Sequence, residues 1–173
     1  MANASTFDLV IQPLGKLHDR VAFSCGKDAL DRFFRTQASQ DVKKRVAATF
    51  VLVDPGNQRR VLGFYTLSAT SIRFSDLPTQ IVKRLPKCPI VPATLLGRLA
   101  VSLEVKGQHL GEFLLMDALH RSLSQGNQIG SLAVVVDAKD DEARLFYRRY
   151  DFIQFSDEPS KFFLPMGSIE KLF

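Results

Sequence analysis

The sequence predicts a single domain of mixed α/β class, and three observations support this prediction. Two stretches rich in β-branched and aromatic residues flank Asp54-Pro55-Gly56-Asn57, and this pattern is typical of a β-hairpin over residues 48–68. Ser131–Asp137 is a continuous apolar run, which is typical of a strand buried on both faces. Segments with helical periodicity precede and follow it. A chain of 173 residues fits one domain, residues 1–173.

The N-terminal half contains a helix, the hairpin and a second, short helix. The first helix is indicated because Leu30, Phe33 and Phe34 share one face while charged residues occupy the others. Asp76 is suited to cap the short helix. The expected elements are a helix at Cys25–Gln40, strands at Ala48–Asp54 and Val61–Ser68, and a short helix at Asp76–Leu85.

The C-terminal half alternates strands and helices, which predicts a mixed sheet. Leu115, Ala118 and Leu119 form the buried stripe of its longer helix, and Asp140 or Asp141 can cap the next one. The expected elements are a central strand at Thr94–Leu103, a helix at Glu112–Ser124, a buried strand at Ser131–Asp137, a helix at Asp141–Tyr150, and strands at Phe152–Phe155 and Lys161–Leu164.

Composition indicates an ordinary globular protein rather than a disordered or fibrous one, with 46% hydrophobic and 24% charged residues. No apolar run is long enough to span a bilayer, and Met1–Phe7 lacks the features of a secretory signal. We therefore expect a cytoplasmic protein without a membrane partner. Cys25 and Cys88 are expected to be free thiols, and no Cys or His spacing suggests a metal site.

The net charge of +5 raises the expectation of a polyanionic partner only slightly. The basic residues gather in clusters, which can be either solvated faces or contacts to such a partner. These clusters are Lys43-Lys44-Arg45, Arg59-Arg60, Lys83/Arg84/Lys87 and Arg148-Arg149.

The turn at Gly107–Gly111 lies between the central strand and the longer helix. Glycines allow a close approach of the backbone to a ligand, and the first N–H groups of a helix can bind an anion such as a pyrophosphate. An ordinary strand-to-helix connection would have the same pattern. The turn matches neither the P-loop nor the dinucleotide-binding GxGxxG motif.

Two nearby segments, Leu95–Val101 and Lys106–Gly111, resemble motif A of the GNAT superfamily of acetyltransferases, whose pattern is Q/R-x-x-G-x-G/A. Val135–Ala138 and Ala143–Phe152 resemble its motif B. The sequence is more similar still to the tRNA-acetylating toxins of type II toxin–antitoxin modules. That similarity extends from Phe23 to Leu164 and includes Phe23–Gly26, Leu30-Asp31, Leu62–Ser68 and Asp117–Leu119.

The resemblance implies the GNAT fold, with a central mixed sheet flanked by helices, and acetyl-CoA as the acetyl donor without a metal. It implies that Tyr147 is the general acid, although the same residue could be a core-face aromatic. The implied cofactor-binding residues are Leu99, Ala100 and Val101 for the pantetheine arm, Lys106, Gly107, Gln108, His109, Leu110, Gly111 and Glu112 for the pyrophosphate, and also Ala138 and Phe146.

This chain departs from the GNAT motifs at three positions. Lys106 stands where Gln or Arg is usual, His109 replaces the middle glycine, and Asp151 replaces the glycine before Phe152. Lys106 still supplies a charge and a donor for phosphate. The backbone at position 109 would have to reach the pyrophosphate despite a β-carbon.

The resemblance implies that the acceptor is the α-amino group of an aminoacyl-tRNA and that a ribbon-helix-helix antitoxin neutralises the protein. It also permits a homodimer. Arg98 is the leading candidate for contact with the RNA, followed by Lys27, Lys43, Lys44 and Arg45. Two other functions remain open at this point: acetylation of a small amine or a protein N-terminus, and a catalytically degenerate binding module.

Overall fold

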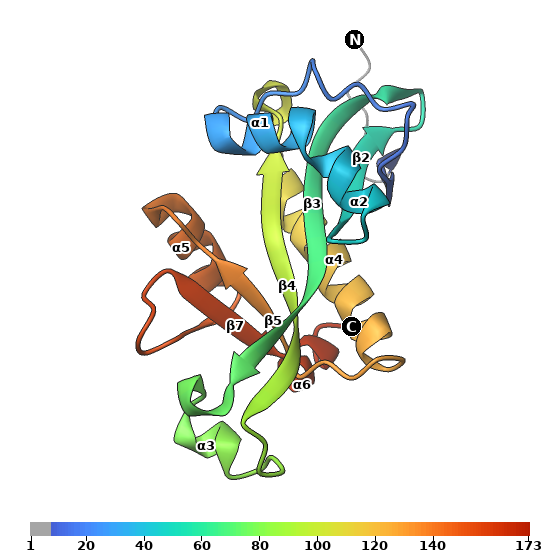
Figure 1. Ribbon diagram of the computed structural model, residues 1–173. Coiled ribbons are helices and arrows are strands. Elements are labelled where there is room, and N and C mark those ends of the chain that lie inside the picture. Colours follow the sequence, from blue (N-terminus) through green and yellow to red (C-terminus); the bar gives the residue numbers. More distant parts are fainter. Residues whose placement is uncertain (1–7) are drawn as a thin grey trace. The chain divides into compact units, whose positions relative to one another are not determined.

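The computed structural model describes residues 8–173 (Figure 1). Its strands are β1 Val10–Pro13, β2 Ala48–Asp54, β3 Asn57–Arg73, β4 Ile90–Val101, β5 Ala133–Asp137, β6 Ile153–Gln154 and β7 Lys161–Pro165. Its α-helices are α1 Asp28–Thr36, α2 Ala38–Lys43, α3 Thr79–Val82, α4 Leu110–Gly126, α5 Asp141–Arg149 and α6 Met166–Glu170. Short 3-10 turns occur at η2 Phe74–Asp76 and η3 Leu103–Val105.

The strands form a seven-stranded sheet in the order β1-β2-β3-β4-β5-β7-β6. Strands β4 and β5 are parallel, whereas β1–β2, β2–β3, β5–β7 and β6–β7 are antiparallel. The predicted mixed α/β class is therefore confirmed. The chain divides into two compact units. Unit 1 contains the described residues up to Ser68 together with Arg98–Ala118, and unit 2 contains Ala69–Gly97 and Leu119–Phe173.

Unit 1 is built on the predicted hairpin of β2 and β3, in which Phe50 lies opposite Tyr65. The turn is closed by the Asp54 carboxylate, which accepts the Gly56 N–H at 2.8 Å. Helices α1 and α2 lie over this hairpin (Figure 1), and α1 contributes Phe34 to a cluster of aromatic rings. The Phe34 ring stacks on Phe64 with centroids 4.4 Å apart. This cluster is the hydrophobic core of unit 1.

The predicted helix at Cys25–Gln40 is wrong in its extent, because the structure has two helices there. Before α1, Gly26 adopts a φ of +86°, and the Asp31 carboxylate accepts the Cys25 N–H at 2.8 Å. These features hold the chain in a non-helical path until Asp28. Gln37 has a φ of −118° and separates α1 from α2. Strand β1 and helix α6 were not predicted.

Unit 2 contains the parallel pair in which Thr94–Leu96 of β4 align with Val134–Val136 of β5. Strand β7 lies on the other side of β5. A second hydrophobic core includes Val135 and Phe163. The short helix predicted at residues 76–85 is reduced to α3, whose N-cap position is occupied by Pro78 rather than Asp76 and has no side-chain capping hydrogen bond. Asp76 instead accepts a hydrogen bond from Arg73 at 3.0 Å.

Cys25 and Cys88 are both free thiols, as predicted. Burial raises the pKa of the Cys25 thiol to about 11, so this thiol is protonated at neutral pH and is a poor nucleophile. Within residues 8–173, the His, Cys, Asp and Glu side chains form no cluster of three or more that could hold a metal ion. Every helix in the same range is too short or too polar to cross a lipid bilayer.

Candidate active site

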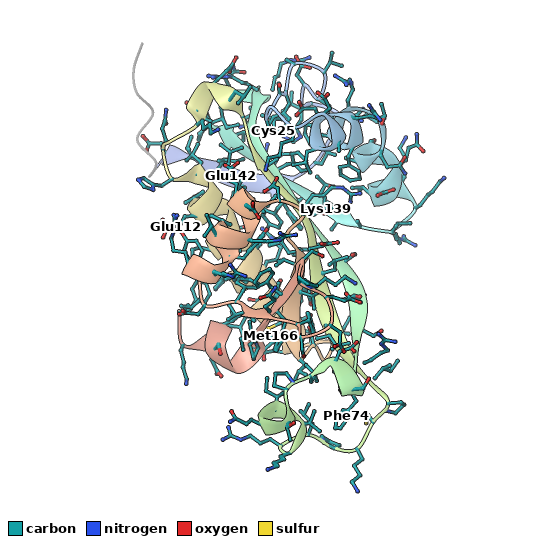
Figure 2. The ribbon with its side chains drawn as sticks, turned by 90° about the vertical axis from the view of Figure 1, so that its left-hand side faces the viewer. Cys25, Phe74, Glu112, Lys139, Glu142 and Met166 are labelled. Atoms are coloured by element: carbon teal, nitrogen blue, oxygen red, sulfur yellow. The ribbon has the colours of Figure 1, made fainter. Side chains whose placement is uncertain are left out.

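The turn that leads into α4 contains two residues with left-handed backbone conformations. Gly107 has a φ of +84° and His109 a φ of +60°, whereas Gln108 between them is outside this left-handed region. Alternation of this kind turns successive N–H groups toward a common concavity. Lys106, Gly107, Gln108 and His109 are all exposed, as is Glu112 in the first turn of the helix (Figure 2). The turn is therefore accessible to a ligand.

His109 takes the left-handed conformation that a glycine would adopt most easily at this position. Its carbonyl accepts the Phe113 N–H at 3.3 Å, which makes it part of the first turn of α4. A left-handed conformation costs a non-glycine residue about 1–3 kcal/mol. The departure from the GNAT motif thus places a non-glycine residue in a left-handed conformation and adds local strain.

The preceding strand places its side chains on alternate faces. Ala100 is buried in the aromatic core of unit 1, so Leu99 and Val101 lie on the opposite face of β4, where they are half-buried. The end of the strand is fixed by two backbone hydrogen bonds, from Ser102 N–H to the Leu62 carbonyl at 2.8 Å and from Leu103 N–H to the Ser24 carbonyl at 2.9 Å. The strand and the turn after it are thereby held within unit 1.

Arg98 lies with its guanidinium carbon 3.5 Å from the centre of the Phe33 ring on α1, the geometry of a cation–π interaction. Burial lowers the pKa of Arg98 from its ordinary value, and the carboxylate of nearby Asp41 acts in the opposite direction. Arginine remains charged in proteins at neutral pH. Half-buried Arg98 is therefore an oriented cation on the surface of unit 1.

The other basic residues predicted to contact RNA lie at the start of α1 and the end of α2. Lys27 is the N-cap of α1, while Lys43 and Lys44 end α2, and Arg45 follows with a φ of +57°. All four are exposed. Arg98 and these four residues all belong to unit 1.

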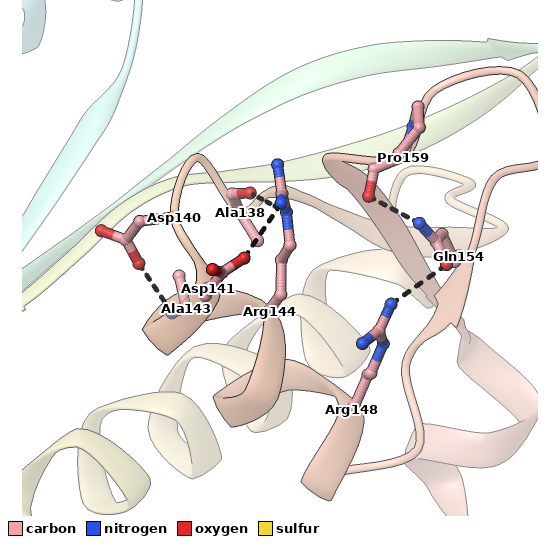
Figure 3. Close-up of polar contacts among 8 residues, drawn as sticks. All are labelled: Ala138, Asp140, Asp141, Ala143, Arg144, Arg148, Gln154 and Pro159. Carbon is pink, nitrogen blue, oxygen red and sulfur yellow. Dashed lines mark hydrogen bonds and ion pairs between the residues drawn. The ribbon is translucent and has the colours of Figure 1, made fainter.

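In unit 2, polar contacts tie the start of α5 to the end of β5 (Figure 3). The Asp140 carboxylate, one of the two predicted candidates, caps α5 by accepting the Ala143 N–H at 2.8 Å. Arg144 donates to the Ala138 carbonyl and to Asp141, both at 3.2 Å. Ala138 itself is fully buried. The position of α5, which bears Phe146 and Tyr147, is thus fixed at its first turn.

Tyr147 is 93% buried, with 7% of its surface exposed. Its ring makes edge contacts with Phe146 and Phe152, each with centroids 5.2 Å apart. Burial raises the pKa of the Tyr147 hydroxyl above its ordinary value of 10.0. The hydroxyl therefore holds its proton throughout the neutral range and can act as a donor but not as a base.

The helix that bears Tyr147 ends in a Schellman motif. Phe152 N–H bonds to the Tyr147 carbonyl at 3.3 Å, and Asp151 N–H bonds to the Arg148 carbonyl at 3.1 Å. Asp151 has a φ of +66°, at the position where glycine is strongly preferred. The contact between the Phe152 and Tyr147 rings completes the motif.

Asp151→Gly is expected to stabilise the chain by about 1 kcal/mol, because glycine adopts the left-handed conformation without steric strain. Urea unfolding followed by circular dichroism measures the change. Arg149→Gly is the matched control, since position 149 is helical and glycine there should destabilise by about 1 kcal/mol. A loss of stability in Asp151→Gly would contradict the assignment of strain to this residue.

In two of the basic clusters, one arginine bonds to another side chain of the protein. Arg148 donates to Gln154 at 3.2 Å, and Gln154 in turn donates to the Pro159 carbonyl at 2.7 Å (Figure 3). A surface cavity of about 420 Å³ lies beside this chain of contacts. Arg60 forms an ion pair with Glu104 in unit 1. These two arginines have partners in the folded chain, which favours a structural role for them.

The sequence alone did not indicate that Phe33 would contact Arg98 or that Arg144 would join the start of α5 to Ala138. Phe33 was assigned to the buried face of a helix, which is correct, but its contact with Arg98 joins segments far apart in the sequence. Arg144 has no local signal beyond its place in the first turn of a helix, three residues after Asp141.

No family model matches this chain. The tRNA-acetylating toxin of Mycobacterium tuberculosis is 37% identical to it over 134 residues, which cover 78% of this chain and 78% of the relative.

Three solved structures are similar over nearly the whole chain. A tyrosine-to-phenylalanine mutant of KacT has a TM-score of 0.90 and 30% identity, covering 96% of this chain and 99% of that chain. AtaT complexed with acetyl-methionyl-tRNAfMet has a TM-score of 0.89 and 29% identity, covering 96% and 99%. A tyrosine-to-phenylalanine mutant of AtaT bound to the C-terminus of the antitoxin AtaR and acetyl-CoA has a TM-score of 0.81 and 27% identity, covering 96% and 98%.

Proposed function

Because this chain belongs to the family of tRNA-acetylating toxins, we propose that it transfers the acetyl group of acetyl-CoA to the α-amino group of an aminoacyl-tRNA and so blocks translation. The observation that carries the proposal is the exposed turn before α4, with left-handed backbone at Gly107 and His109, in a chain that also buries a protonated tyrosine on α5. The solved neighbour AtaT is complexed with an acetylated aminoacyl-tRNA in one structure and with acetyl-CoA in another. In this proposal the whole chain acts as one acetyltransferase domain.

Acetyl-CoA would be held mainly by backbone groups. We assign the pantetheine arm to the strand residues Leu99, Ala100 and Val101. The pyrophosphate would lie on the turn and first helical residues from Lys106 to Glu112, where N–H groups and the positive end of the α4 dipole favour an anion. Ala138 and Phe146 are assigned to the same co-substrate.

Tyr147 is proposed to be the general acid. The neutral amine attacks the thioester carbonyl, the carbon–sulfur bond breaks, and the departing thiolate takes the proton of the Tyr147 hydroxyl. The nitrogen of the new amide loses its extra proton to water, and the Tyr147 phenolate takes up a proton from the solvent, which restores the general acid. Aminoacyl esters have amines that are appreciably neutral near pH 7, so a strong general base is not required.

The test is incubation of the purified chain with acetyl-labelled acetyl-CoA and total charged tRNA. The expected result is label in the RNA fraction, recovered as N-acetyl amino acid after mild alkaline hydrolysis of the ester. Label that remains in acetyl-CoA, from a chain that binds CoA, would contradict tRNA acetylation. Small amines and peptide N-termini as acceptors in the same assay would then identify the alternative substrate.

Arg98 is proposed to contact a phosphate near the acceptor end of the tRNA, because it is an oriented cation beside the strand assigned to acetyl-CoA. Lys27, Lys43, Lys44 and Arg45 would add contacts to the RNA backbone. They are exposed at the start of α1 and the end of α2, and phosphate contacts supply most of the affinity that does not depend on sequence.

Arg98→Ala is expected to raise the KM for aminoacyl-tRNA about tenfold and to lower the slope of log affinity against log salt by about 1. CoA affinity, measured by calorimetry, should not change. Arg98→Lys is the matched variant: it keeps the charge but loses the planar stack on Phe33, so an intermediate KM is expected. An unchanged salt slope in Arg98→Ala would argue against a phosphate contact.

An antitoxin is the second proposed partner. AtaT is solved with the C-terminus of the antitoxin AtaR, and KacTA is solved with DNA. A DNA-binding antitoxin of the ribbon-helix-helix type, encoded beside this chain, would fit both observations. We also propose a cytoplasmic location, where charged tRNA is present, and a homodimer. Growth arrest on expression, relieved by co-expression of the antitoxin, tests this part of the proposal.

A further inference from the structure

The longest helix of the protein, α4, is joined to β3 by a hydrogen bond between two side chains. The Tyr65 hydroxyl donates to the Asp117 carboxylate at 2.5 Å. Tyr65 is fully buried and its ring stacks on Phe50, with centroids 5.2 Å apart. Because the acceptor is a carboxylate, this is a strong, charge-assisted hydrogen bond. It links the middle of the helix to a rigid part of the hairpin.

The same face of β3 also sets how closely α4 approaches the sheet. Gly63 and Tyr65 are two residues apart on one strand and therefore share a face. A β-carbon at Gly63 would lie 2.8 Å from a methyl carbon of Leu114 and 2.9 Å from the Ala100 carbonyl oxygen. The helix, β3 and the segment of β4 that contains Ala100 thus meet at Gly63, with no space for a side chain.

These contacts act at a distance along a stiff element. Asp117 lies about two turns from Leu110, where the helix begins, or roughly 10 Å at 1.5 Å per residue. Leu114, Leu115 and Ala118 are fully buried around it. A shift or rotation of α4 at Asp117 is therefore transmitted to its first turn. The close approach of Gly63 to Ala100 fixes the distance from the helix to β4, the strand assigned to the pantetheine arm.

We propose that Tyr65 and Asp117 are a positioning pair for the co-substrate: they hold the first turn of α4 at the distance from β4 that acetyl-CoA requires. The inference rests on the proposed function, in which that turn binds the pyrophosphate. The pair takes no part in the chemical step. It sets the affinity for the phosphate-containing end of acetyl-CoA. Loss of the pair should therefore weaken the binding only of substrates that carry a pyrophosphate.

The experiment compares acetyl-CoA with S-acetylpantetheine, a thioester that lacks the pyrophosphate and the nucleotide. Tyr65→Phe and Asp117→Ala are each expected to raise the KM for acetyl-CoA about tenfold with little change in kcat, the effect of losing a hydrogen bond to a charged group. The kcat/KM for S-acetylpantetheine should change by less than about twofold. Asp117→Asn keeps an acceptor oxygen for the Tyr65 hydroxyl and should restore most of the affinity for acetyl-CoA.

Val53→Ala is the matched control, because Val53 is fully buried in the core of unit 1 against α1 and α2 rather than α4. It should lower the unfolding midpoint and leave the ratio between the two substrates unchanged. Equal losses on both thioesters in Tyr65→Phe would overturn the proposal, because they indicate a general loss of fold. An unchanged KM for acetyl-CoA would also overturn it.

Calorimetry with CoA and with pantetheine separates this inference from the proposed function. If the wild-type chain acetylates no tRNA but binds CoA, the proposed reaction fails, and weaker CoA binding by Tyr65→Phe at unchanged pantetheine binding still supports the positioning pair. If the wild-type chain binds CoA no better than pantetheine, the pyrophosphate makes no contribution and the pair has no such role.

Discussion

Tyr147→Phe is expected to lower the rate of acetyl transfer by about 10²–10⁴-fold, the usual contribution of a general acid. The substitution removes one hydroxyl and keeps the ring that packs against Phe146 and Phe152. Folding and CoA affinity should therefore be unchanged. Single-turnover transfer from labelled acetyl-CoA to charged tRNA measures the chemical step directly.

Tyr150→Phe is the matched control for this prediction. Tyr150 follows the same helix and also contacts Phe146, with ring centroids 5.2 Å apart, but it is only half-buried. Its loss of a hydroxyl should leave the rate within about twofold of the wild type. Equal rates for Tyr147→Phe and the wild type would exclude Tyr147 as the acid and would support a catalytically passive, core-packing role.

The pH dependence of the same assay follows from the burial of Tyr147. Burial raises the pKa of this hydroxyl above 10.0, so the acid stays protonated and its ionisation should not reduce the rate between pH 7 and pH 9. The folded chain binds this proton more tightly than the unfolded chain does. Its contribution to stability is therefore complete below about pH 10 and falls as the pH rises above that value.

Local sequence patterns predicted most of the elements that carry the candidate site. The turn residues at Asp54–Asn57 predicted the hairpin, and the apolar run predicted β5. Asp140 and Asp141 were the two candidates for the cap of α5, and Asp140 fills that role, because an N-cap depends on residues only a few positions apart. These signals work because each element is determined largely by its own residues.

Contacts between distant segments could not be predicted in the same way. The stack of Arg98 on Phe33 and the close approach at Gly63 join segments that meet only after folding. The extent of the first helix was also wrong, because the tertiary hydrogen bond from Cys25 N–H to Asp31 and the left-handed Gly26 override helical periodicity. Periodicity identifies a buried face but does not reveal what covers it.

The unpredicted contact at Gly63 supports the second large prediction, in which Gly63→Ala destabilises the chain by about 3 kcal/mol, the upper end of the range for overpacking. One of the two close neighbours of the new β-carbon is the Ala100 carbonyl oxygen at 2.9 Å. A side-chain methyl such as that of Leu114 can rotate away, whereas the Ala100 carbonyl belongs to the backbone near the end of β4 and cannot move unless the strand moves with it. For a chain of this size, the expected fall in Tm is about 6–12 °C.

Differential scanning calorimetry of Gly63→Ala beside Gly15→Ala tests this prediction. A β-carbon at Gly15 would meet no atom within 4 Å, so that control changes the backbone entropy alone and should shift the free energy of unfolding by less than about 1 kcal/mol. Similar Tm values for the two variants would mean that β3 and β4 can move apart enough to accommodate the new methyl group. The first turn of α4 would then not be held against Ala100 by close packing at Gly63.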